Sequence, residues 1–196
     1  MITQSNISDK RKELLAAALK LFVENGFHGT PTSSIAKEAG VAHGTLFHYF
    51  KTKDELVIAL YISIKQEMGT CSAPFLEKDI GLKEKVMGIF TASIEWGLKH
   101  RNEFQFIEQF HHSPFLKMVP TAEIQEQGKP ALDLLKKGIK EKILKPMDVD
   151  FMITIVMSQL FGLYKYLIQT NLSRKKQQAL IEETVHLLWD MISTGK

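Results

Sequence analysis

The sequence predicts an all-α protein of about nine helices, with a small three-helix part at the N-terminus and a larger helical part after it. Apolar residues recur every three or four positions along most of the chain, as they do on one face of an α-helix. Glycine, proline or hydroxyl residues interrupt this pattern at the expected helix ends, and no segment alternates cleanly enough for a strand. The 44% hydrophobic and 24% charged content is typical of a globular chain.

The first three helices are expected to be short and closely linked. Thr30 is predicted to cap the second helix, because its side chain can accept an amide hydrogen bond, with Pro31 in the first turn. Gly40 is predicted to adopt the left-handed backbone that a sharp turn into the third helix requires. The expected ranges of the three helices are 9–25, 32–39 and 43–50.

The rest of the chain predicts longer helices in a second domain. Gly128 and Pro130 interrupt one of these patterns, so a kink or break is expected there. The segment 148–170 is apolar almost all round, which is typical of a helix covered on several sides. These patterns divide the chain into a domain of residues 1–52 and a domain of residues 53–196, whose expected helices lie at 54–68, 82–99, 102–112, 121–144, 148–170 and 173–193.

The three N-terminal helices have the spacing of a helix-turn-helix. Ile35 and Ala36 are expected to face inward, and Leu46 and Phe50 to hold the third helix against the first. The third helix would then present its remaining polar positions to the major groove of DNA. The pattern alone also fits a three-helix packing unit in a helical scaffold that binds no DNA.

Composition limits the other classes of function. The net charge of +3 permits DNA binding without requiring it. Cys71 is the single cysteine, so an internal disulfide is excluded and a reducing cytoplasmic setting is expected. The first residues lack a signal-peptide pattern, and no window holds eighteen uninterrupted apolar residues, so no membrane partner is expected. No catalytic motif or zinc spacing is evident, and neither an enzyme nor a cofactor is expected.

Residues 26–56 resemble the DNA-binding region of the tetracycline-repressor (TetR) family, through Gly26-Phe27, Gly44-Thr45-Leu46 and Phe50-x-x-Lys53. The resemblance covers about a quarter of the chain; the rest matches the family only in length and helix count. It implies a homodimeric repressor that binds a double-stranded DNA operator and is released by a small-molecule effector. Thr30, Ser33 and Lys53 would contact phosphates, whereas His43, Gly44 and Thr45 would approach base edges. His48 and Tyr49 would contact the backbone or flanking bases.

Two positions depart from the commoner family pattern, and they affect how DNA would be read. Ala42 stands where serine is frequent and Phe47 where tyrosine is frequent, so one hydroxyl contact is lost at each. The third helix also lacks the Arg, Lys, Asn and Gln side chains that make bidentate base contacts. Thr45 and Ala42 are therefore expected to touch thymine methyl groups, while DNA shape supplies much of the specificity.

The resemblance also implies a dimer interface and an effector pocket in the second domain. An apolar stripe on the last two helices is expected to pair with a second copy, although it also fits intrachain core; its residues are Ile155, Gln159, Leu163, Leu180, Thr184, Leu187, Leu188 and Met191. Aromatic and polar residues of the middle helices are expected to line the pocket, although an aromatic stripe also fits core; they are Phe90, Trp96, Phe104, Phe106, Glu108, Phe110, His111 and Phe115.

A different class of protein shares one feature with this sequence. Glu108-x-x-His111 and Glu183-x-x-His186 have the spacing that di-iron carboxylate bundles use, which leaves a helical-bundle metal oxidase as an alternative. Such a site needs two further glutamates on other helices, and in a chain with seven histidines such pairs also arise by chance. No metal site is therefore expected.

Overall fold

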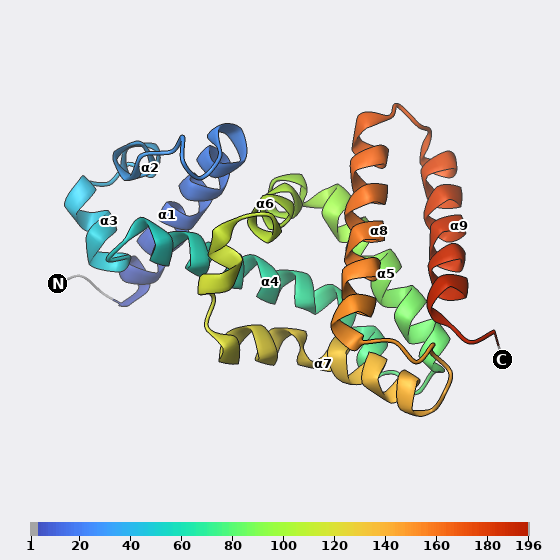
Figure 1. The fold of residues 1–196 in the computed structure, drawn as a ribbon. Helices are drawn as coiled ribbons and strands as arrows, with labels where there is room; N and C mark the ends of the chain where they lie inside the picture. Colours follow the sequence, from blue (N-terminus) through green and yellow to red (C-terminus); the bar gives the residue numbers. More distant parts are fainter. Residues whose placement is uncertain (1–3, 196) are drawn as a thin grey trace. The chain divides into compact units, whose positions relative to one another are not determined.

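The computed structural model describes residues 4–195, with side chains described for residues 9–120 and 128–195. The regular structure in this part of the chain is helical (Figure 1), which confirms the predicted all-α class. The elements are α1 (Gln4–Asn25), α2 (Thr32–Glu38), α3 (His43–Tyr49), α4 (Lys53–Glu77), α5 (Leu82–Lys99), α6 (Arg101–His111), the 3₁₀ helix η1 (Pro114–Met118), α7 (Thr121–Lys140), α8 (Val149–Gln169) and α9 (Arg174–Ile192).

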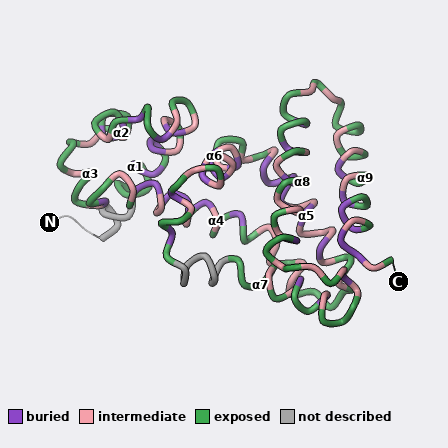
Figure 2. The backbone as a smooth tube through the Cα atoms, viewed as in Figure 1, coloured by how far each residue is buried: buried purple, intermediate pink, exposed green. Residues whose placement is uncertain are grey.

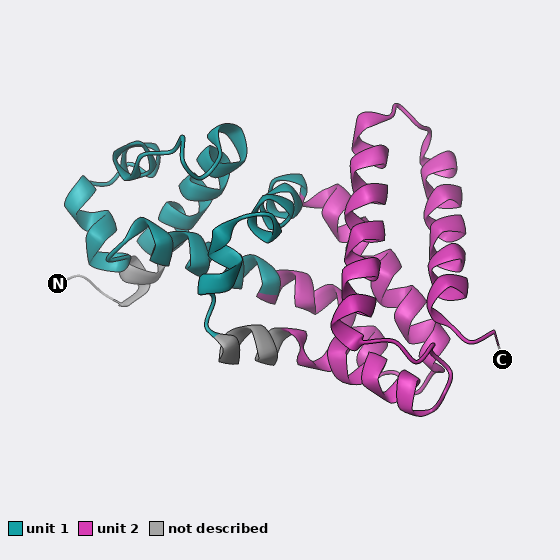
Figure 3. Cartoon of the chain, viewed as in Figure 1, with its two compact units in different colours: residues 1–65, 101–120 teal, residues 66–100, 121–196 magenta. Residues whose placement is uncertain are grey.

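The chain forms two compact units, and the boundary between them does not follow the order of the sequence (Figure 3). Unit 1 comprises residues 1–65 and 101–120, and unit 2 comprises residues 66–100 and 121–196. Helix α6 therefore belongs to the unit that holds α1, α2 and α3, although α5 and α7 on either side of it in sequence belong to unit 2. The predicted boundary after residue 52, between a DNA-binding domain and a regulatory domain, stays a prediction.

Local interactions account for where the short helices begin and end. Gly26 follows α1 with φ +70°, and Gly40 follows α2 with φ +65°, so both occupy the left-handed region that glycine enters at low cost. The prediction for Gly40 is confirmed. Thr52 precedes α4, where its Oγ1 accepts a hydrogen bond from the amide of Glu55 at 3.1 Å. The Glu55 carboxylate in turn accepts one from the amide of Lys51 at 2.8 Å, so donors at this helix start are satisfied.

The predicted break in α7 is absent, and the alternative of a kink at Gly128 and Pro130 stays a prediction. The helix runs from Thr121 to Lys140 through both Gly128 and Pro130. Proline removes one backbone hydrogen bond inside a helix, and here that loss does not end the helix. The helix ends at Lys140, and Lys142, two residues later, has a positive φ of 58°.

Unit 2 is built around α5, α8 and α9, whose buried residues include Phe90, Ile94, Leu160, Val185 and Leu188. Helices α8 and α9 pack as an antiparallel pair joined by a short loop (Figure 1). The Lys145 ammonium donates hydrogen bonds to the carbonyls of Asp190 at 3.2 Å and Met191 at 2.7 Å. A cation at the C-terminal end of α9 satisfies carbonyls that the helix leaves open and complements its dipole.

Helix α8 has an unusual surface for a helix at the edge of a unit. Of the described helices, α8 is the one that is long and apolar enough to cross a membrane, with a mean hydropathy of 1.5 over its most apolar 18-residue window. Only 28% of that 18-residue window is buried. Length and composition alone do not distinguish a span from a helix whose apolar side meets another protein. The count of uninterrupted apolar residues missed this feature because single polar residues break the run.

Candidate nucleic-acid interface

Helices α2 and α3 form the predicted helix-turn-helix. The chain reverses between them through Gly40, and the amide of Val41 donates to the carbonyl of Ala36 at 2.9 Å. Ile35 and Leu46 are completely buried, and Ala36 is 1% exposed, as the sequence predicted. These apolar contacts fix how α3 lies against the rest of the three-helix group, because such burial is the main favourable term in packing.

Much of α3 is coloured as exposed or intermediate in Figure 2, and most of the predicted DNA-contact residues belong to this part of the chain. Phe47 is 41% exposed, and no atom of another part of the chain lies within 4 Å of where a side chain at Gly44 would begin. Thr45 and Tyr49 are half-buried. The exposed predicted residues of this segment are Ala42, His43, Gly44, Phe47 and His48. The seven-residue helix therefore offers an open surface of small and aromatic side chains without a bidentate base-reading group.

The phosphate contact predicted for the Thr30 hydroxyl is wrong. Thr30 is 1% exposed, and its hydroxyl donates to the backbone carbonyls of Leu21 at 3.0 Å and Gly26 at 2.8 Å. Its single hydroxyl hydrogen is therefore used within the turn that connects α1 to α2. Thr30 is also not the capping residue of α2, because Pro31 occupies that position. Ser33, on the first turn of α2, is exposed, and its phosphate contact stays a prediction.

The structure reveals one contact in the helix-turn-helix that the sequence prediction missed. Thr32 Oγ1 lies 3.0 Å from His43 Nε2, which joins the first residue of α2 to the first residue of α3. The His43 ring also meets Phe47 edge to face, with 5.0 Å between the ring centroids. The spacing of four between His43 and Phe47 was visible in the sequence, but the contact with Thr32 depends on the angle of the turn.

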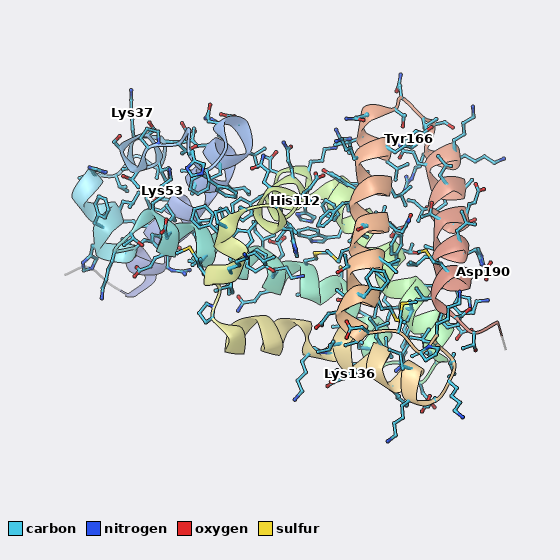
Figure 4. All side chains as sticks on the ribbon, viewed as in Figure 1. Lys37, Lys53, His112, Lys136, Tyr166 and Asp190 are labelled. Atoms are coloured by element: carbon cyan, nitrogen blue, oxygen red, sulfur yellow. The ribbon has the colours of Figure 1, made fainter. Side chains whose placement is uncertain are left out.

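Lys53, which is labelled in Figure 4, is the first residue of α4 and belongs to unit 1. Its ammonium is 6.0 Å from the centroid of the Phe22 ring, and partial burial lowers the pKa of Lys53 from its ordinary value. Arg11 of α1 lies similarly over Phe50, at 5.4 Å. In both pairs the charged end of the side chain lies near the face of an aromatic ring, which is a cation–π arrangement. The phosphate contact of Lys53 stays a prediction.

The residues predicted to line an effector pocket do not form one group. Phe106, Phe110 and Phe115 lie in unit 1 and pack against Phe27, with ring centroids 5.2–6.4 Å from it. Phe110 also stacks on Tyr61 at 4.0 Å. Phe104, which is fully buried, and half-buried Glu108 share α6 with them, whereas Phe90 and Trp96 are buried in unit 2. The rings in unit 1 therefore serve as core between α6 and α1, and a ligand-contacting role stays a prediction.

His111, at the end of α6, is held in its neutral form. Burial, together with the nearby charges of Lys65 and His112, lowers the pKa of His111 to about 4 from an ordinary value of 6.5. In the unfolded chain the imidazole takes up a proton as pH falls below 6.5, while in the folded chain it does not. Acidification from pH 6.5 toward 4 should therefore cost up to about 3 kcal/mol of unfolding free energy through this residue, at roughly 1.4 kcal/mol per pH unit.

We expect His111→Gln to flatten the loss of stability between pH 7 and 4.5 relative to the parent protein. The measurement is urea unfolding followed by circular dichroism at several pH values. His28→Gln is the matched control, because His28 is exposed and is not among the groups that lower the pKa of His111, so the slope should stay unchanged. If unfolding free energy fell equally with pH in the parent and in His111→Gln, the lowered pKa of His111 would be contradicted.

The predicted dimer surface divides into exposed and buried parts. Leu187 is 63% exposed and Gln159 is also exposed, whereas Leu188 is 2% exposed and lies in the core of the protomer. Assigning Leu188 to the interface was therefore wrong. The half-buried members of the predicted set are Ile155, Leu163, Leu180, Thr184 and Met191. Sequence reasoning missed two exposed aromatic residues of α8, Phe151 at 57% and Tyr166 at 52%. Tyr166 is labelled in Figure 4.

The structure gives no support for a metal centre in the described part of the chain. There, no three or more His, Cys, Asp or Glu side chains are grouped so that they could hold a metal ion. The two Glu-x-x-His pairs lie in different units, on α6 and α9.

The fold and the site together define a class of protein. A short exposed helix follows a sharp glycine turn, and a larger helical unit accompanies it, as in helix-turn-helix DNA-binding regulators. The sequence matches the family of bacterial regulatory proteins, tetR family, over residues 14–60, and a tetracyclin repressor-like C-terminal domain over residues 74–194. The chain belongs to the tetR family of transcriptional regulators.

Individual relatives agree with this assignment. The transcriptional repressor KstR2 of Mycolicibacterium smegmatis is 30% identical over 162 residues, which span 76% of this chain and 74% of that protein. The fatty acid metabolism regulator protein of Bacillus subtilis is 32% identical over 120 residues, which span 61% of this chain and 55% of that protein. A crystal structure of a tetR-family regulator from Shewanella sp. PV-4 superposes with a TM-score of 0.86 at 27% identity, covering 94% of this chain and 98% of that one.

Proposed function

We propose that this protein is a homodimeric transcriptional repressor that binds a palindromic DNA operator and is released from it by a small, largely apolar ligand. The observation that supports this most directly is the exposed face of α3, which follows the Gly40 turn in a chain of the tetR family. The protein would act in the cytoplasm, where its DNA is found, and would catalyse no reaction.

The outward side of α8 and α9 supports the dimer. Phe151, Tyr166 and Leu187 are large side chains that are more than half exposed in the isolated chain. Gly162, on the same helix as Phe151 and Tyr166, has open space where a side chain would begin, which would let a second helix approach closely. A two-fold dimer would also present two copies of α3 to two half-sites, about 34–36 Å apart on DNA.

The effector is proposed to act by changing the populations of two states. A ligand that binds more tightly to the state with weak DNA affinity shifts the equilibrium toward that state. A long-chain acyl compound is one reasonable first probe, because one relative is named for fatty acid metabolism. The screen should also include steroid-like and aromatic compounds, because the structurally similar KstR2 of Mycobacterium tuberculosis is a ketosteroid transcriptional regulator. A ligand that raises the melting temperature and weakens operator binding would support the proposal.

Thr45 and Ala42 are proposed to read thymine methyl groups at the start of α3. We expect Thr45→Ala to change the base preference at one or two positions of each half-site and to weaken operator binding about five- to tenfold, because one apolar base contact is lost. The measurement is selection of bound duplexes from randomised DNA, followed by fluorescence anisotropy at fixed salt, with Ser34→Ala on exposed α2 surface as the control. An unchanged base preference would contradict direct readout by Thr45, and parent protein that bound no duplex would contradict the repressor itself.

A further inference from the structure

The contact between Thr32 and His43 gives the helix-turn-helix a feature that its general architecture does not require. Thr32 Oγ1 and His43 Nε2 are 3.0 Å apart, and they join the starts of α2 and α3. We propose that Thr32 and His43 act together as a relayed hydrogen-bond donor to one DNA phosphate, so that His43 orients Thr32 for the backbone and does not read a base. This inference rests on the proposed function, because it concerns how the protein holds its operator.

The argument begins with the hydrogen atoms available to the pair. A threonine hydroxyl has one hydrogen to donate, and an imidazole nitrogen either donates or accepts. When His43 Nε2 carries no hydrogen, Thr32 must donate to it, and its hydroxyl then has only lone pairs left for the surroundings. Phosphate oxygens are acceptors, so in that state the Thr32 hydroxyl has no hydrogen left to donate to a phosphate.

The roles reverse when His43 Nε2 carries a hydrogen. The imidazole then donates to Thr32 Oγ1, and the hydroxyl hydrogen becomes available to a phosphate oxygen. Protonation of His43 also places a positive charge next to that hydroxyl, and hydrogen bonds that involve charged groups are stronger than neutral ones. Binding of a phosphate at Thr32 should therefore favour the protonated ring, and protonation should favour the bound phosphate.

Two observations assign this role to Thr32: the nearby Thr30 hydroxyl is already hydrogen-bonded, and the His43 ring is held beside Thr32. The Thr30 hydroxyl is spent on two backbone carbonyls inside the turn, so it is not available to DNA. Thr32 is half-buried and His43 is exposed, which leaves the pair accessible from outside. The edge-to-face contact with Phe47 limits how far the His43 ring can rotate away from Thr32.

The proposal predicts that DNA affinity depends on pH. The His43 ring has a hydrogen bond with Thr32 of α2 and an edge-to-face contact with Phe47 of α3. Glu38 of α2 is paired with Lys20 of α1, at 2.6 Å, so its charge is already balanced. The other titratable residues of the two helices are Lys37, His48 and Tyr49. His48 is a second imidazole on the same helix, so the experiment must separate it from His43.

The experiment uses the full-length protein and a duplex recovered by the parent from randomised DNA. Operator affinity is measured by fluorescence anisotropy between pH 5.8 and 8.0 at constant ionic strength. Thr32→Val keeps the branched shape of the side chain without the hydroxyl, Thr32→Ser restores the hydroxyl, and His43→Phe keeps a ring without nitrogen. Ser34→Ala is the matched control on α2. His48→Gln tests whether the other histidine of α3 contributes to the pH dependence.

The parent should bind about five- to tenfold more tightly at pH 6 than at pH 8, an increase within the range of one charge-assisted hydrogen bond. Thr32→Val and His43→Phe should each remove most of that increase, and the double variant should be no weaker than the weaker single variant. Thr32→Ser should restore the increase, and His48→Gln should retain it. A role that is merely structural would lower affinity equally at every pH and would not be rescued by serine.

Nitrogen-15 spectra of the histidine rings provide a second measurement that does not depend on affinity. In the free protein at pH 8, His43 should carry its hydrogen on Nδ1, and in the DNA complex Nε2 should be protonated. Operator binding by Thr32→Val that equals the parent at every pH, or an Nε2 that stays unprotonated in the complex, would overturn the relay while leaving the repressor intact. A parent protein that recovers no duplex from randomised DNA would overturn both the relay and the proposed repressor function.

Discussion

Leu187→Glu is expected to convert the protein from a dimer to a monomer and to weaken operator binding by at least a hundredfold. Leu187 is 63% exposed in the isolated chain, so a glutamate there costs the protomer little. In a two-fold dimer, however, the substitution places two unpaired carboxylates in an apolar interface, and each such burial costs several kcal/mol. A monomer holds one half-site at a time and loses the gain in affinity that two linked contacts provide.

Sedimentation velocity and fluorescence anisotropy measure the two effects separately. Ile80→Glu is the matched control, because Ile80 is another exposed aliphatic residue of unit 2 and lies outside α8 and α9. Ile80→Glu should remain a dimer and bind the operator like the parent. A Leu187→Glu protein that sediments as a dimer at the same concentration would show that this side of α9 is not the interface.

Phe110→Ala should lower the unfolding free energy by about 3–5 kcal/mol, the usual cost of removing a large ring from a packed core. Phe110 is completely buried and stacks on Tyr61 at 4.0 Å, and the rings of Phe27, Phe106 and Phe115 lie 6.0–6.4 Å from it. Truncation would leave a cavity that four surrounding rings must close. Because a domain of this size is stable by roughly 5–15 kcal/mol, the loss should be visible at once in thermal and urea unfolding.

Phe110→Leu is the control for this prediction, since leucine fills most of the lost volume and should cost no more than about 2 kcal/mol. Operator binding should fail at a lower temperature for Phe110→Ala than for Phe110→Leu, because α6 is part of the unit that holds α2 and α3. An alanine variant that unfolds within 1 kcal/mol of the parent would show that the aromatic cluster is not a stabilising core.

The sequence was most informative where a residue type has one physical use. Gly40 predicted the left-handed turn because few other residues enter that conformation cheaply, and Leu46 and Phe50 predicted the packed side of α3 because both are large and four residues apart. The hydroxyl residues were harder to assign. Thr30 and Thr32 differ by two positions, and only the folded turn shows that Thr30 bonds inward while Thr32 reaches His43.

Apolar residues on α9 show a second limit of the sequence. Leu187 and Leu188 are adjacent and chemically identical, yet one is 63% exposed and the other 2%. Successive helix positions point about 100° apart, so a helix with a broad apolar surface can place either one against its own protomer. The placement of α6 in unit 1 was also not predictable, because helical periodicity identifies an apolar side without identifying the helix that covers it.

The membership of α6 in unit 1 has a consequence for exchanging operator specificity between regulators. A fragment of residues 1–52 would carry α2 and α3 but would leave behind Phe106 and Phe110, whose rings lie against Phe22 and Phe27 of the fragment. In such a fragment the rings of Phe22 and Phe27 would be exposed to water as an apolar surface prone to aggregation. A hybrid protein that is to recognise this operator must therefore inherit residues 101–120 from the same parent as residues 1–65, although 35 residues of a different unit separate them in the chain.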